Sequence, residues 1–394
     1  MSKKMLEISM LKNYGPSNLN RDEGGNPKDC IFGGALRGRI SSQCLKRNIR
    51  KSEFFVNEIS KELLGIRTVH MPTLVAEILN NKGYSESVAE IAASWLVTTG
   101  ANDEKKSDRE HESTEEKNAG LKTKQIMFFS LQEIELIADV LSKIIDEKGN
   151  DTKELKKVKE VSKLIDGKIK SLNIKPTSVD MAMFGRMITS NSYKNVEASV
   201  QVAHAISTNK LEREFDFFTA VDDLTTDEEM QSEGTDMLGD TGFNSNCYYM
   251  YCSIDLEELE KNLSALGEGA HNIVKKAVIG FVKAFAYSNP SGKQNSFAAH
   301  SIPGNVIASI KDKKIPINLA DAFLTPVVSR YDRDLMQASV DKLSMHIDKV
   351  DKKYSETRPE KRLWFSLCDD VRKPELSEVC DSFDQLIKRL VEII

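Results

Sequence analysis

Positive charge is concentrated between Lys28 and Lys51, and a segment with so many cations can bind phosphate groups. Seven cations lie in this stretch against a single acid, Asp29, although the whole chain carries a formal net charge of −5. The cations are Lys28, Arg37, Arg39, Lys46, Arg47, Arg50 and Lys51. Because binding of a polyanion depends on the local potential rather than on the total charge, we expect a cationic patch here.

A helix that begins near Ser41 and Ser42 would strengthen this patch. A serine hydroxyl at a helix start caps one backbone N–H group and leaves other N–H donors facing an anion. At about 100° per residue, four polar side chains after the serines fall within one arc of roughly 100°, with Leu45 and Ile49 on the opposite side. The four are Gln43, Lys46, Arg47 and Arg50. One face of the helix is thus expected to pack and the other to bind.

The residues before this helix also fit close contact with a polyanion backbone. Gly33 and Gly34 permit close approach of the main chain to a ligand, and Arg37 and Arg39 share one face if their segment is extended. The alternative interpretation is a solvated helix face whose cations pair with acids elsewhere in the chain. The combination of a phosphate-ready helix start, a Gly-Gly turn and few acids favours phosphate contact without reading of base sequence.

The apolar spacing along the chain predicts an α+β fold with a helical insertion. Residues 5–14 are compatible with a strand, and residues 54–175 carry apolar side chains every three to four positions, as helices do. Short β-compatible runs follow at 178–187, 198–206 and 247–256. This order predicts a sheet domain that is interrupted by a helical domain.

The rest of the chain divides into charged excursions and further elements. Residues 214–246 contain ten acids and no Lys or Arg, and we expect a protruding loop or hairpin there. Residues 101–118 have almost no apolar side chain, which is typical of a solvated loop. A long amphipathic helix is predicted over 266–288, a loop leading into a strand over 290–310, and helices at the carboxyl end.

The composition is that of a folded protein in a reducing compartment. With 394 residues, of which 40% are hydrophobic and 29% charged, the chain is long enough for two or three domains. Its six cysteines form no CxxC pair, and we interpret them as reduced thiols. The amino terminus lacks an apolar leader core, and no stretch approaches about eighteen consecutive apolar residues. We therefore expect a cytoplasmic protein with no membrane partner.

Six motifs, spread over most of residues 1–300, resemble those of one protein family. They are NLNRDEGGNPKDCIFGGALRGRISSQCLKRNIRKS (18–52), RTVH (67–70), MAMFGRMITSN (181–191), VAHAISTN (202–209), FDFFTAVDDL (215–224) and LGDTGFNSNCYYMY (238–251). On these motifs the sequence resembles the CasC-type backbone subunit, an RNA-binding, RAMP-like protein of the type I-E CRISPR Cascade complex.

The resemblance implies a modified RNA-recognition (ferredoxin-like) palm made of residues 1–53 and 176–394. A helical fingers domain would occupy 54–175, and a thumb hairpin about 214–246. It further implies a role in antiviral defence, in which copies of the subunit oligomerise along a CRISPR guide RNA (crRNA) with other Cascade subunits. The guide would then be presented for pairing with target DNA. The resemblance implies no cofactor and no metal.

Together with the cationic patch, the resemblance assigns residues to nucleic-acid contacts. The RNA-binding set is Arg21, Lys28, Arg37, Arg39, Ser41, Ser42, Gln43, Lys46, Arg47, Arg50, Gly185, Arg186, Met187 and Leu238. Met187 and Leu238 would act as apolar wedges that break base stacking, although a lone Met or Leu is more often a core residue. A basic fingers helix that meets DNA corresponds to Lys153, Lys156, Lys157, Lys159 and Lys163. The acids between these lysines fit a solvated helix face equally well.

A metal-dependent ribonuclease subunit is the alternative function, because related CRISPR backbone subunits cut target RNA with an aspartate and a metal ion. Asp22 and Asp29 are the candidate acids, but neither belongs to a carboxylate cluster. His204 lies in an apolar strand without a recognisable acid partner, and we interpret it as structural. The chemistry of His70 is not evident. With no Walker loop, zinc spacing or GxSxG motif, we expect a non-catalytic RNA-binding scaffold.

Overall fold

Two units make up the chain. The computed structural model describes residues 4–97, 121–123, 125–156, 161–172, 177–188, 193–220 and 237–394. Unit 1 consists of Met1–Glu58, Val200–Glu257 and Val278–Ile394, and unit 2 of Ile59–Ser199 and Glu258–Ala277. The helical domain expected at 54–175 falls mostly within unit 2, which also includes residues 176–199 and 258–277.

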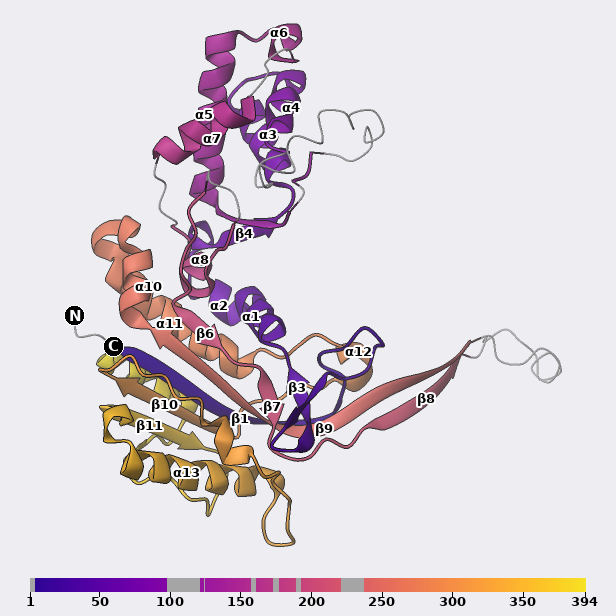
Figure 1. Ribbon diagram of the computed structural model, residues 1–394, viewed down its shortest axis with the longest axis vertical. Coiled ribbons are helices and arrows are strands. Elements are labelled where there is room, and N and C mark those ends of the chain that lie inside the picture. The colour runs from indigo at the N-terminus through magenta and orange to yellow at the C-terminus, as the bar shows by residue number, and fades with distance from the viewer. Residues whose placement is uncertain are drawn as a thin grey trace, which may run out of the picture. The chain divides into compact units, whose positions relative to one another are not determined.

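Figure 1 labels most of the elements. The strands of unit 1 are β1 (Met5–Ser17), β2 (Asp29–Phe32), β3 (Ala35–Ile40), β6 (Val200–Val202), β7 (Ala205–Ser207), β8 (Glu214–Ala220), β9 (Met237–Asp255), β10 (Asn305–Lys311), β11 (Lys361–Ser366) and β12 (Glu378–Val379). Its helices are α1 (Ser42–Lys51), α2 (Glu53–Val56), α12 (Gln294–Phe297), α13 (Leu335–Lys353) and α14 (Phe383–Ile393), with 3-10 turns η5 (Leu319–Phe323) and η6 (Ser355–Thr357).

Unit 2 is mainly helical. Its elements are η1 (Lys61–Leu63), β4 (Gly65–Thr68), α3 (Met71–Asn81), α4 (Glu86–Ser94), β5 (Met127–Ser130), α5 (Leu131–Lys148), α6 (Thr152–Lys156), α7 (Val161–Leu172), α8 (Val179–Phe184) and η4 (Ser264–Gly269). The helices α10 (Leu256–Asn262) and α11 (Ala270–Tyr287) contain residues of both units. Among the residues placed by the structure, no helix is long and apolar enough to cross a membrane.

A ten-stranded sheet organises unit 1. Its order is β12-β11-β10-β1-β9-β7-β3-β2, and β6 and β8 also pair with β9. The β11–β12 pair is parallel, and the other strand pairs described in this sheet are antiparallel. The α+β class expected from the sequence is therefore confirmed, with a large and mostly antiparallel sheet.

Both faces of the sheet are covered at β1. Residues Met5–Lys12 of this strand are all buried, although alternate side chains of a strand point to opposite faces. On one face, Leu11 belongs to an apolar cluster with Leu343 of α13. On the other face, Lys12 donates a hydrogen bond to the main-chain oxygen of Ala286 in the last turn of α11. Apolar side chains and helices on both sides thus hold the central strands in place.

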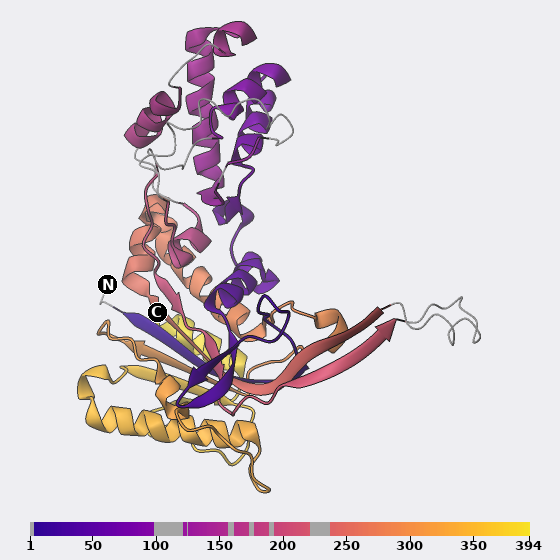
Figure 2. The ribbon, with the colours of Figure 1, turned by 45° about the vertical axis from the view of Figure 1, so that its right-hand side comes forward.

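The strands β8 and β9 form an arm that extends from the sheet, as both views show (Figures 1 and 2). The seven residues of β8 pair antiparallel with the first seven residues of β9, from Glu214↔Phe243 to Ala220↔Met237. The rest of β9 pairs with β1, from Asn244↔Ser17 to Asp255↔Met5. One long strand therefore belongs to both the arm and the core of unit 1.

Several elements differ from the sequence-based expectation. The helical pattern expected over 54–67 is interrupted: α2 ends at Val56, and Gly65 begins the strand β4. Main chain and rings crowd Gly65, where an added Cβ would lie 2.5 Å from the Phe128 ring. The run 178–187 was expected as a strand but contains the helix α8, which ends at Gly185 with a φ of +77°. The carboxyl-terminal region, expected to be helical, also contains β11 and β12.

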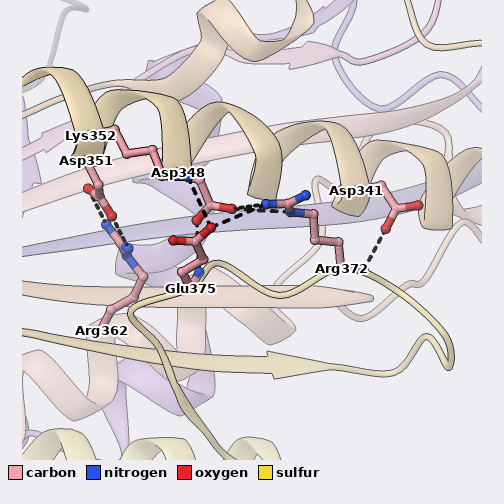
Figure 3. Close-up of polar contacts among 7 residues, drawn as sticks. All are labelled: Asp341, Asp348, Asp351, Lys352, Arg362, Arg372 and Glu375. Carbon is pink, nitrogen blue, oxygen red and sulfur yellow. Dashed lines mark hydrogen bonds and ion pairs between the residues drawn. The ribbon is translucent and has the colours of Figure 1, made fainter.

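An ion-pair network joins α13 to the chain that follows it (Figure 3). Arg362 of β11 makes a bidentate pair with Asp351, at 2.7 and 3.1 Å, and both side chains are buried. Asp348 accepts hydrogen bonds from Arg372 at 2.6 Å and from the main-chain N–H of Glu375 at 2.9 Å. Asp341 and Lys352 complete the network through Arg372 and Glu375. These acids of α13 are engaged within unit 1, and we assign them a structural role.

Lys12 should make the stability of unit 1 depend on pH. Its side chain has no accessible surface and donates to the main-chain oxygens of Ala286 at 2.8 Å and Ser288 at 3.2 Å. Burial lowers the pKa of Lys12 from its ordinary value of 10.5 to about 7. Between these values the unfolded chain holds a proton that the folded chain has released. The free energy of unfolding should therefore rise with pH in this window, by at most about 1.4 kcal/mol per pH unit.

Chemical denaturation of the native chain and of Lys12→Met measures this effect, because methionine does not titrate and its lost hydrogen bonds to Ala286 and Ser288 add a stability difference that does not depend on pH. The stability of the native chain relative to the variant should increase from about pH 7 upward and stay constant below it. A stability difference that is independent of pH would contradict the prediction, since Lys12 would then remain charged in the folded chain.

Candidate nucleic-acid interface

The helix α1 begins at the predicted serine pair. Ser41 is the N-cap residue, and its hydroxyl accepts a hydrogen bond from the main-chain N–H of Cys44 at 3.3 Å. The N–H of Ser41 donates to Oδ1 of Asn20 at 2.9 Å. Ser41 is buried, whereas Ser42 is the half-buried first residue of the helix. The first turn contains no acid, so the positive end of the helix dipole is not neutralised from within the turn.

The two faces of α1 are those predicted by the helical projection. Leu45 and Ile49 are buried, at 5% and 1% exposure, and hold the helix in unit 1. Gln43 and Arg47 are exposed, and the flanking residues Lys46 and Arg50 are half-buried. Burial lowers the pKa of Lys46, but its long aliphatic stem allows the ammonium group to reach the surface. The polar face of α1 thus brings three cations and an amide together.

The loop between β1 and β2 supplies two more predicted cations. Arg21 is exposed, and Lys28 is half-buried. The main-chain N–H of Lys28 donates to the oxygen of Asn20 at 2.8 Å, and the N–H of Arg39 donates to the oxygen of Lys28 at 2.9 Å. Because Asn20 also accepts from the cap residue of α1, the loop, β3 and the helix start are linked through one asparagine.

A cavity of about 500 Å³ lies beside α1 within unit 1. Arg21 of the loop and Arg47 of the helix both line it, so the fold brings together two predicted contacts that are distant in sequence. Asn48 adds an amide to the lining, and Asp22 and Glu23 add carboxylates. The cavity therefore offers hydrogen-bond donors and acceptors, which suits a polar ligand larger than a single phosphate.

Arg37 is not part of this surface, and its predicted RNA contact is wrong for this structure. The side chain has no accessible surface. Its guanidinium donates to four main-chain oxygens, those of Ser207, Thr208, Phe323 and Leu324, at 2.7 to 3.3 Å. Buried carbonyl groups need a donor, so Arg37 ties β3 to the end of β7 and to η5 instead of binding a ligand.

Arg39 and His204 lie together at the edge of the cationic patch. The Nε of Arg39 donates to the main-chain oxygen of Asp29 at 3.0 Å, and its NH1 lies 3.2 Å from Nδ1 of His204. His204 is exposed, so its interpretation as a structural residue of an apolar strand is not supported. The sequence feature that would have predicted this exposure is a break between two short strands, because residue 204 lies between β6 and β7.

In unit 2, the predicted contacts Gly185, Arg186 and Met187 separate into buried and exposed residues. Arg186 is buried and pairs with Glu133 at 2.7 Å, with both side chains 2% exposed. It also donates to the main-chain oxygens of Phe128 and Lys194. The predicted RNA contact of Arg186 is therefore wrong for this structure, and its charge is used inside unit 2. Met187, by contrast, is 90% exposed.

The arm carries exposed aromatic residues that sequence reasoning missed. Phe215, Phe217 and Phe218 of β8 are 59%, 67% and 43% exposed. Leu238 lies on β9, paired in register with Thr219. The signal for the missed residues was an aromatic run that alternates with acids in a segment without cations, since period-two alternation indicates a strand with two different faces.

The lysines predicted to contact DNA are only partly described. Lys153 and Lys156 are exposed residues of α6. Lys157 and Lys159 lie outside the described residues, and only the main chain of Lys163 is described, within α7. The structure thus shows two exposed lysines at this position, and it does not test a continuous basic helix.

The two candidate acids have partners within unit 1. Oδ1 of Asp22 accepts from the main-chain N–H of Asn26 at 2.9 Å, and the carboxylate of Asp29 pairs with Arg213. Within the described parts of the chain, no group of three or more His, Cys, Asp or Glu side chains is arranged to hold a metal ion.

Solved chains with the same fold come from CRISPR complexes. One, described as a CRISPR RNA-guided surveillance complex, pre-nicking, superposes with a TM-score of 0.78 at 23% sequence identity and covers 99% of both chains. Another, described as a CRISPR RNA-guided surveillance complex, has a TM-score of 0.59 at 21% identity, again over 99% of both chains. At such identities the likeness shows the fold. No curated protein sequence matches significantly.

The family is shown by the sequence itself. The family model described as CT1975-like protein (Cas_CT1975) matches residues 6–390, nearly the whole chain. Together with the shared fold, this match confirms the resemblance to a CRISPR family that the motifs indicated. The chain is a member of the CT1975-like protein family.

Proposed function

We propose that this protein is a non-catalytic backbone subunit of a type I-E CRISPR Cascade complex, which binds guide crRNA along the sugar–phosphate backbone. The observation that carries the proposal is the polar face of α1, where Gln43, Lys46, Arg47 and Arg50 lie opposite a buried apolar face. Cations and helix N-termini bind phosphates without reading sequence. The bases of the guide would then remain available for pairing with target DNA.

The remaining assignments follow from the same proposal. The sheet of unit 1 would be a modified RNA-recognition palm, unit 2 the fingers, and the arm of β8 and β9 the thumb. The exposed Met187 and the apolar side chains of the arm would displace a guide nucleotide at intervals, because an apolar wedge competes with base stacking. Further copies of the chain would oligomerise along the guide beside other Cascade subunits. The exposed Lys153 and Lys156 are candidates for contact with DNA.

The proposed absence of catalysis has a direct test. The hydrogen bond to Asp22 and the ion pair of Asp29 give both carboxylates a role within the protein. We therefore expect that the purified assembly, incubated with complementary RNA and magnesium, leaves this RNA intact. Cleavage that is abolished by Asp29→Ala would contradict the scaffold proposal and favour the metal-dependent ribonuclease.

The double replacement Lys46→Ala/Arg50→Ala should weaken binding of single-stranded RNA by roughly tenfold or more at moderate salt. Each phosphate contact with a single strand contributes about 0.7 to the slope of log affinity against log salt concentration. The variant should therefore lower that slope by about 1.4, which titration of a labelled RNA at several salt concentrations measures.

The matched control is Lys349→Ala/Lys353→Ala, which removes two exposed lysines from α13 in the same unit. It changes the net charge by the same amount, so a general effect of charge would weaken RNA binding equally in both variants. Equal losses, or an unchanged salt slope in Lys46→Ala/Arg50→Ala, would contradict the assignment of the α1 face.

A further inference from the structure

The short connection between β6 and β7 places an exposed histidine among cations. NH1 of Arg39 lies within hydrogen-bond distance of Nδ1 of His204, at 3.2 Å. A guanidinium can only donate, so Nδ1 of the neutral ring is the acceptor and its hydrogen is carried by Nε2. Within the described residues, no further hydrogen bond of this ring is found. An N–H donor of His204 thus remains for a ligand.

Arg39 is held in place from its other side. Its Nε donates to the main-chain oxygen of Asp29 at 3.0 Å, while the carboxylate of Asp29 pairs with Arg213. Because Arg213 occupies this acid, Arg39 has a carbonyl group and a neutral imidazole as its partners instead of a carboxylate. The positive charge of Arg39 is therefore left without direct neutralisation by these contacts, beside the ring of His204.

The charged groups around the ring favour an anion. Burial lowers the pKa of His204, and the positive charges of Arg39 and Lys28 lower it further. From β9, Tyr249 and Tyr251 contribute no charge near neutral pH, since the ordinary pKa of a phenol is 10 and burial raises it further in both. His204 is thus neutral at pH 7 and lies in a region of positive potential.

We propose that Lys28, Arg39 and His204 hold one phosphate of the guide RNA at the end of β3, and that His204 takes up a proton from solvent when this phosphate binds. The proposal rests on the proposed function and adds a specific subsite and a pH dependence to it. The single negative charge of the phosphodiester offsets part of the positive charge of Lys28 and Arg39, so the imidazolium is stabilised in the complex. Protonation turns Nδ1 into a donor, so NH1 of Arg39 must leave the ring and donate to the phosphate instead. Binding then couples to protonation, and the affinity must increase as the pH falls.

The pH profile of RNA binding tests this subsite. The probe is a labelled oligouridylate, whose bases do not titrate in this range, and its affinity for the full chain is measured by fluorescence anisotropy from about pH 5 to about pH 8. One unit of difference between the free and bound pKa of His204 corresponds to about a tenfold change in affinity. We expect the native chain to bind roughly three- to tenfold more tightly at the acidic end, and His204→Gln to lose this increase.

Two controls separate the subsite from general effects of pH. His346→Gln alters a histidine of α13 in the same unit and should retain the pH profile of the native chain. NMR titration of the native chain, with the His204 signal assigned through His204→Gln, should show a higher pKa of this ring with RNA than without it. This second readout is measured on the native chain, and the variant serves only to assign the signal.

The outcomes distinguish the subsite from the proposed function. If the native chain fails to bind RNA at every pH, the RNA-binding function itself is overturned. If the native chain binds RNA and Lys46→Ala/Arg50→Ala weakens the binding, but His204→Gln keeps the native pH profile, only the subsite is overturned. An unchanged pKa of His204 in the RNA complex would also overturn it.

Discussion

Replacement of Arg37 by methionine should lower the free energy of unfolding of unit 1 by about 3 kcal/mol or more. The guanidinium donates to the main-chain oxygens of Ser207 at the end of β7, of Thr208 after it, and of Phe323 in η5, all in buried hydrogen bonds, and to that of Leu324 in a part-buried one. Methionine fills much of the volume but donates no hydrogen bond. Each carbonyl oxygen that is left without a donor costs about 1 to 3 kcal/mol.

Tryptophan fluorescence isolates this effect, because the chain has two tryptophans and they lie in different units. In a Trp95→Phe background, Trp364 of β11 reports the unfolding of unit 1 in denaturant. Arg47→Met is the matched control: it removes an exposed arginine of α1 in the same unit and should change the stability by no more than about 0.5 kcal/mol. Equal stabilities of Arg37→Met and Arg47→Met would contradict the structural role of Arg37.

Local periodicity explains why α1 could be predicted and Arg37 could not. The faces of α1 follow from the 3.6-residue repeat, so the burial of Leu45 and Ile49 could be inferred from ten consecutive residues. The burial of Arg37 depends on Phe323, 286 positions away, which supplies one of its acceptors. Alternation within β3 correctly put Arg37 and Arg39 on one face of the strand. It contained no information about which part of that face is covered.

Short apolar runs were a second source of error. The run 178–187 has the length and apolar content of a buried strand, but it contains the helix α8, which Gly185 ends with a positive φ; its N-cap residue Ser178 makes no side-chain capping hydrogen bond. An added Cβ at Gly185 would lie 2.9 Å from the main-chain oxygen of Val196. The neighbour that requires the glycine is thus eleven residues further along the chain, beyond the range of a local pattern.

The net charge of the chain did not predict its local surface charge, because acids and cations lie in different segments. Asp348 and Asp351 of α13 are neutralised by arginines from β11 and the loop after it, and further acids lie along the arm. The cations of α1 have no acid in the first turn of their helix. A chain with a net charge of −5 can therefore present a cationic surface. The local count of residues 28–51 indicated this surface, although one of its seven cations, Arg37, is buried.

Arg186→Met should destabilise unit 2 by about 3 to 5 kcal/mol, whereas Met187→Ala should change its stability by less than about 0.5 kcal/mol. Arg186 pairs with Glu133 at 2.7 Å in a buried site, so its removal leaves a buried carboxylate without its counter-charge. Met187 is 90% exposed, and its removal leaves no cavity. With Trp364→Phe as background, the fluorescence of Trp95 reports the unfolding of unit 2.

A second replacement identifies the cause of the loss. Glu133 also accepts from the main-chain N–H of Ser130 in the capping box of α5, and glutamine keeps an acceptor there without the charge. Adding Glu133→Gln to Arg186→Met should therefore recover part of the lost stability, because no unpaired charge stays buried. If the double variant is no more stable than Arg186→Met, the loss arises from the carbonyl groups of Phe128 and Lys194 rather than from Glu133. If Met187→Ala binds RNA more weakly while unit 2 keeps its native stability, Met187 acts in RNA binding, whereas the neighbouring buried Arg186 acts in stability.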